Sequence, residues 1–118
     1  MQKTIDYELL SDEEKLLLAK ELFDYHDQMF QNDLKVYYAE VWNIGHRTFV
    51  EQLSGRRTMR PKQLTFVVDY LIGRTSERPV REIFKRLFDA TPEAYGYLLT
   101  PTEPLPFDDA KPLTSVII

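Results

Sequence analysis

Side chains that can bind an anion or recognise a hydrogen-bonding pattern gather between residues 46 and 62. An arginine such as Arg47 can donate two hydrogen bonds to N7 and O6 of guanine, Glu51 can accept one from N4 of cytosine, and Val50 can contact a thymine methyl group. Hydroxyls, ring N–H groups and backbone amides near a helix start suit phosphate, as do arginines in the loop that follows. The residues that we predict to bind DNA are His46, Arg47, Thr48, Val50, Glu51, Ser54, Arg56, Arg57, Arg60 and Lys62.

Catalytic and metal-binding chemistry has little support along the chain. There is no cysteine, and the two histidines, His26 and His46, stand far apart in the sequence. The run Tyr25-His26-Asp27 has residue types that catalysis uses, but no second element supports it, so we interpret His26 as a histidine in solvent or at the edge of the core. The sequence also lacks a glycine-rich loop that would cradle phosphate and lacks metal-ligand spacing. We therefore expect no enzyme activity, no metal and no cofactor.

Five segments with apolar residues at helical spacing must position the predicted DNA-binding side chains. The first follows a capping box formed by Ser11 and Glu14, and its apolar stripe includes Leu17 and Met29. Asn32 or Asp33 is expected to cap the second. The predicted helices span residues 12–30, 34–42, 46–54, 61–73 and 79–88. Because no segment alternates like a β-strand, we predict an all-α fold, a five-helix bundle.

Prolines change the character of the chain after the fifth predicted helix. They interrupt any regular helix apart from a short turn around residues 92–97, and they are Pro92, Pro101, Pro104, Pro106 and Pro112. We therefore predict one helical domain over residues 1–98 and an irregular, extended tail over residues 99–118. The last three residues, 116–118, are Val-Ile-Ile, which is too apolar for an ordinary solvated end.

The charge is distributed unevenly along a chain whose net charge is −4. Residues 33–86 carry eleven Lys and Arg against six acidic residues, a net of +5, whereas residues 1–32 carry −5 and residues 87–118 carry −4. A phosphate backbone responds to the local face of a protein and not to its total charge. The 43% apolar content suffices for one packed core, and no apolar run is long enough to span a membrane. A cytoplasmic protein is the expected class.

Four residues stand at the relative positions that a helix-turn-helix requires, which predicts that the second and third helices form such a unit. Such a unit needs a small residue in its first helix, a residue that tolerates a sharp turn, and apolar residues that lock the two helices together. Ala39 is the small residue, and Asn43, four positions later, can adopt the left-handed backbone of the turn. Ile44 and Phe49 are the residues expected to be buried after the turn and in the second helix. That second helix then presents its outer side to the major groove.

This spacing resembles the Cro and phage-repressor family of helix-turn-helix proteins. Many members end the recognition helix with a Leu-Ser-Gly-Arg-Arg-like segment, which stands here at residues 53–57, and continue with a proline-containing loop and an amphipathic helix closed by Leu-Gly. Pro61 and Gly73 hold the corresponding places, with Gly73 one residue late. The resemblance covers residues 34–73 and implies a helix-turn-helix at about residues 34–54. The chain departs from the pattern at Asn43, where glycine is usual, at Gln52, where an apolar or aromatic side chain is usual, and in its first helix.

The resemblance implies a sequence-specific, repressor-like DNA-binding regulator of transcription whose partner is double-stranded DNA. One recognition helix reads only a few base pairs, so we also expect a homodimer. The alternative is a protein-interaction module, antitoxin-like or inhibitory, that binds a basic partner through the acidic flanks of the chain.

Overall fold

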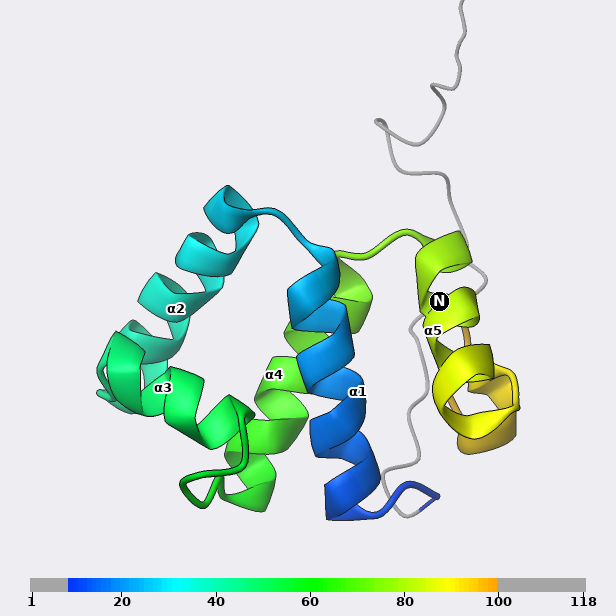
Figure 1. Cartoon of the computed structure of the whole chain (residues 1–118), viewed down its shortest axis with the longest axis horizontal. Helices are drawn as coiled ribbons and strands as arrows, with labels where there is room; N and C mark the ends of the chain where they lie inside the picture. Colours follow the sequence, from blue (N-terminus) through cyan, green and yellow to red (C-terminus); the bar gives the residue numbers. More distant parts are fainter. Residues whose placement is uncertain (1–8, 100–118) are drawn as a thin grey trace, which may run out of the picture.

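The computed structural model describes residues 9–99, which fold into five α-helices and a short 3₁₀ turn (Figure 1). The elements are α1 (Asp12–Tyr25), α2 (Gln28–Trp42), α3 (His46–Leu53), α4 (Pro61–Gly73), α5 (Glu77–Phe88) and η1 (Pro92–Tyr95). The predicted all-α fold with five helices is therefore confirmed. The predicted tail beyond Leu99 lies outside the described residues.

Helix α1 lies at the centre of the fold and packs mainly against α4 (Figure 1). It also contacts α3 on one side and α5 on the other, while α2 packs against α3. The predicted capping box starts α1: Ser11 Oγ accepts from the amide of Glu14 at 3.1 Å, and the Glu14 carboxylate accepts from the amide of Ser11 at 2.9 Å. Leu18, Leu22 and Val68 are fully buried and belong to the core. Helices α1 and α4 thus form the central pair of the fold, and α2 and α3 lie on one side of it.

The predicted first helix, residues 12–30, is wrong in extent because the chain breaks at His26. The backbone of His26 is extended (φ −86°, ψ 160°), and Asp27 then caps α2 by accepting from the amide of Phe30 at 2.9 Å. Helix α2 therefore begins at Gln28, before the cap that we predicted at Asn32 or Asp33. An aspartate that bonds its own downstream amide favours a helix start over a helix interior, and this local preference ends the first apolar stripe early.

Two apolar side chains of the predicted first stripe are exposed. Met29, in the first turn of α2, is 76% exposed, and Leu17, on α1, is 44% exposed. His26 lies at the edge of the core, as we interpreted it: its ring stacks on Phe30 at 3.6 Å and its Nε2 lies 2.8 Å from Oγ1 of Thr75. That bond joins the α1–α2 junction to the end of α4.

The segment after α5 contributes residues to the core. Tyr97 is buried with its ring 5.6 Å from that of Phe84, and Leu99 is only 6% exposed. The core of the described residues therefore extends to Leu99. Within residues 9–99, no helix combines the length and the apolar character that crossing a bilayer requires.

Candidate nucleic-acid interface

The turn between α2 and α3 has the conformation that the sequence predicted. Asn43 ends α2 in the left-handed region (φ 54°, ψ 45°), and its amide donates to the carbonyl of Ala39 at 2.8 Å. Gly45 returns to an extended conformation as the residue before α3. Ile44 is half-buried and packs against the core, so it is less enclosed than we expected. A left-handed asparagine is tolerated where most side chains are strained, and this conformation turns the chain within three residues.

Two aromatic contacts fix which side of α3 faces the core. Phe49 is fully buried, with its ring 4.5 Å from that of Tyr38 on α2 and 5.8 Å from that of Phe23 on α1. Leu53, one turn later, is buried as well. Because Phe49 and Leu53 face inward, the opposite side of the helix must face solvent. On α2, Tyr38 is buried and Tyr37 is 41% exposed.

The solvent side of α3 holds most of the predicted base-reading residues. Arg47 is the most prominent, with 93% of its side chain exposed, and His46 and Val50 beside it are exposed too. Thr48 is half-buried, and Ser54 is exposed just after the last turn. Among the loop residues that we predicted to contact phosphate, Arg56, Arg57, Arg60 and Lys62 are all exposed.

A buried polar network under α3 was not predicted from the sequence. Gln52 is 5% exposed and its Oε1 accepts from the hydroxyl of Tyr38 at 2.9 Å. Its Nε2 donates to the carbonyl of Thr58 at 3.0 Å and to Oε1 of Gln63 at 3.4 Å. Gln63 Oε1 in turn accepts from the amide of Arg60 at 2.9 Å. Burial also raises the pKa of Tyr38 to about 12, so its hydroxyl is a proton donor at neutral pH.

This network fixes the loop that follows α3. Gly55 turns the chain with a positive φ of 89°, and the amides of Arg56 and Arg57 both donate to the carbonyl of Glu51. The loop is then tied to the core where Gln52 binds the carbonyl of Thr58. Short loops that are bonded at both ends present their side chains in a defined place, so the loop arginines lie at the end of α3.

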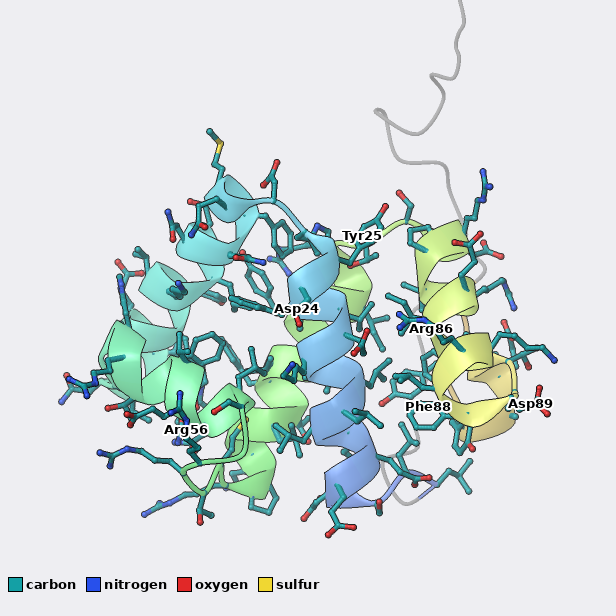
Figure 2. The ribbon with its side chains drawn as sticks, in the orientation of Figure 1. Asp24, Tyr25, Arg56, Arg86, Phe88 and Asp89 are labelled. Atoms are coloured by element: carbon teal, nitrogen blue, oxygen red, sulfur yellow. The ribbon has the colours of Figure 1, made fainter. Side chains whose placement is uncertain are left out.

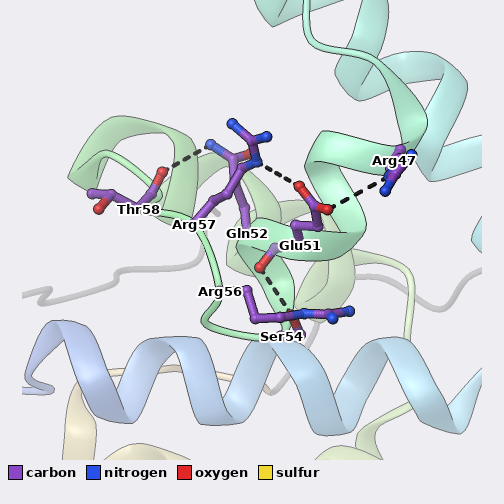
Figure 3. A network of polar contacts seen from close by, with 7 residues as sticks. All are labelled: Arg47, Glu51, Gln52, Ser54, Arg56, Arg57 and Thr58. Carbon is purple, nitrogen blue, oxygen red and sulfur yellow. Dashed lines mark hydrogen bonds and ion pairs between the residues drawn. The ribbon is translucent and has the colours of Figure 1, made fainter.

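The carboxylate of Glu51 joins the helix to the loop (Figure 3). Its Oε1 accepts a hydrogen bond from Nε of Arg57, and its Oε2 lies 3.6 Å from Nε of Arg47. The hydrogen bond from Arg57 is the main reason that the pKa of Glu51 lies below its usual value, with smaller contributions from the charges of the nearby arginines. Nε of Arg56 contacts Oγ of Ser54 at 3.4 Å. Five predicted residues thus form one polar cluster on the outer side of α3: Arg47, Glu51, Ser54, Arg56 and Arg57.

The opposite side of the molecule carries a different surface. Figure 2 shows Arg56 on the α3 side of α1, Asp24 and Tyr25 on α1 itself, and Arg86 on α5. Helices α1 and α5 enclose a shallow hollow of about 280 Å³, lined by Glu21, Asp24, Tyr25, Pro79, Glu82, Ile83 and Arg86. Its acids already have partners: Glu21 pairs with Arg86 at 3.0 Å, and Asp24 and Glu82 pair with cations on their own helices.

Metal chemistry has no support within residues 9–99, where no three His, Asp or Glu side chains come together as metal ligands would. Comparisons with models of protein families, with characterised proteins and with solved structures find no match to this chain. The resemblance to Cro and the phage repressors stays a prediction.

Proposed function

We propose that this chain binds double-stranded DNA by placing α3 in the major groove, and that it regulates transcription in this way. One observation carries the proposal: Phe49 and Leu53 hold α3 by its inner side, so that Arg47 projects from the outer side next to a loop of three arginines. An arginine on a recognition helix is the side chain that most often reads guanine. Arginines at the end of that helix then lie where the phosphate backbone borders the groove.

Salt dependence of binding tests the phosphate part of this proposal. Affinity for duplex DNA should fall steeply as salt rises, since each neutralised phosphate releases a counterion. A fluorescently labelled duplex, selected from a random pool by the protein itself, is titrated at several salt concentrations. Arg56→Ala should weaken selected and random duplexes about equally and reduce the salt slope by about 1. A chain without salt-dependent affinity for duplex DNA would contradict the proposal.

The role of Arg47 is tested by a pair of matched substitutions. Arg47→Ala should weaken binding to the selected duplex by about 1–3 kcal/mol and relax its sequence preference. Arg78→Ala is the control, because Arg78 is similarly exposed and similarly paired with a glutamate one turn later, but it lies on α5. If both variants kept the wild-type preference, α3 would not be the reading helix.

The alternative function, binding of a basic protein partner through acidic surface, has one feature in its favour. The hollow between α1 and α5 presents three carboxylates and the ring of Tyr25. Each carboxylate is already neutralised by a Lys or Arg, which weakens the attraction for a second cation. We therefore place DNA binding first. Affinity for a cationic peptide that Asp24→Asn abolishes, in a chain without affinity for DNA, would reverse that order.

A further inference from the structure

Glu51 is the one acidic side chain in the cluster of arginines that the proposed DNA surface presents. It lies on α3 one turn after Arg47, and its side chain is 21% exposed. A carboxylate at this position repels the phosphates of any DNA that approaches α3. A carboxylate within this cationic surface must therefore have a role other than attracting DNA.

The contacts of Glu51 show what the carboxylate does in the unbound chain. One oxygen engages Arg57 from the loop and the other faces Arg47 from the helix, in both cases at the Nε atom. A guanidinium has five N–H groups, so one that is held at Nε keeps the four N–H groups of its two terminal nitrogens for another acceptor. The backbone carbonyl of Glu51 also accepts from the amides of Arg56 and Arg57. Glu51 therefore anchors the helix arginine, the loop arginine and the loop backbone at one point.

Two consequences follow for DNA that lies against this surface. The carboxylate of Glu51, 3.6 Å from Nε of Arg47, favours conformers of Arg47 that keep this ion pair, which reduces the entropy lost when its terminal nitrogens bind the edge of guanine. Phosphates, in contrast, must compete with the carboxylate for Arg47 and Arg57 and are repelled by its charge. The first effect favours the correct base sequence, while the second weakens binding to every sequence.

We propose that Glu51 is a specificity-determining positioning residue, which holds Arg47 and Arg57 for the correct site and suppresses binding to other DNA. This inference rests on the proposed function. It replaces the expectation that Glu51 itself reads cytosine, because both of its oxygens already face arginines.

Glu51→Gln tests the inference, because it removes the charge and keeps the size of the side chain. Glu82→Gln is the matched control: it removes the same charge from another Arg–Glu pair one helical turn apart, on α5. Both variants are titrated with the selected duplex and with a duplex of random sequence, at several salt concentrations. Urea denaturation of each variant shows that the fold is kept.

The Glu51→Gln variant should bind the random duplex about fivefold more tightly, as expected for the loss of one unfavourable charge near the surface. Its salt slope should steepen by about 1, because a released arginine can neutralise a further phosphate. Affinity for the selected duplex should change less or fall, so the ratio of the two affinities should drop about fivefold. Glu82→Gln should leave this ratio unchanged.

A second background separates positioning from charge alone. In Arg57→Gln, one of the two arginines held by Glu51 is absent, so adding Glu51→Gln should produce a smaller gain for random DNA than it does in the wild type. An equal gain, or an unchanged affinity ratio in Glu51→Gln, would overturn the inference while leaving the proposed function intact. If the wild-type chain had no salt-dependent affinity for duplex DNA, both the inference and the proposed function would be contradicted.

Discussion

Replacing Gln52 with leucine should destabilise the fold by about 2 kcal/mol, although leucine is apolar and similar in size. The side chain of Gln52 accepts from the Tyr38 hydroxyl at 2.9 Å and donates to the Thr58 carbonyl at 3.0 Å. Without Gln52 the buried hydroxyl has no acceptor among these groups, which costs about 1–3 kcal/mol. Loss of the bond to Thr58 adds about 1 kcal/mol. Burial of the additional apolar surface of leucine returns about 1 kcal/mol of this cost.

A second substitution isolates the cost of the unpaired hydroxyl. Tyr38→Phe alone should be destabilising, because it removes the donor and leaves Oε1 of Gln52 without it. The double variant Tyr38→Phe/Gln52→Leu removes both partners, so it should be more stable than Gln52→Leu by about 1 kcal/mol. Two-state analysis of the four proteins as a double-mutant cycle gives the coupling energy between the two side chains.

Urea denaturation followed by tryptophan fluorescence is a suitable assay, since Trp42 is the single tryptophan and its ring lies 6.4 Å from that of Tyr38. A Gln52→Leu protein as stable as the wild type would refute the reasoning, and so would a double variant no more stable than Gln52→Leu. The loop gives a functional readout as well. Release of Thr58 should reduce affinity for DNA even though Arg47 and α3 are unchanged, because the loop arginines lose their defined position.

Three further predictions concern the turn, the edge of the core and the oligomeric state. Asn43→Val should lower the free energy of unfolding by about 1–2 kcal/mol in urea denaturation, because a β-branched residue is strained in the left-handed region, whereas Asn43→Gly should remain near the wild type. Burial lowers the pKa of His26 below its usual value, against a smaller opposing effect of Asp27, so protonation favours the unfolded chain. The contribution of neutral His26 to the free energy of unfolding should be fully present above about pH 6.5 and should fall as the pH drops below that value. In the same urea titration, the free energy of unfolding of His26→Gln should decline less over this pH range. Sedimentation should give a dimer for the full chain at tens of micromolar and a smaller species for a chain truncated after Leu99, which retains the buried end of the domain; a monomeric full chain with DNA affinity unaffected by truncation would reject the dimer.

The parts of the fold that the sequence predicted correctly are those that neighbouring residues decide. A capping box, a left-handed asparagine and apolar residues at helical spacing act within a turn or two of chain, so Ser11, Asn43 and Phe49 all took their predicted places. The same helical spacing correctly predicted which side of α3 faces solvent, and that Arg47 lies on this side. The prediction was wrong at His26. Apolar residues at helical spacing continue across this position, so we predicted one helix where Asp27 caps the start of a second one.

Tertiary structure decided how the polar side chains are used. Gln52 departs from the expected apolar pattern, and it is tolerated in the core because Tyr38 and Gln63, which lie far from it in sequence, supply its hydrogen bonds. The sequence placed Glu51 on the outer side of α3, but only the folded chain shows that the loop brings Arg57 back to its carboxylate. A buried amide or a surface carboxylate is stable only with the partners that folding brings to it, and sequence spacing does not specify which distant groups those are.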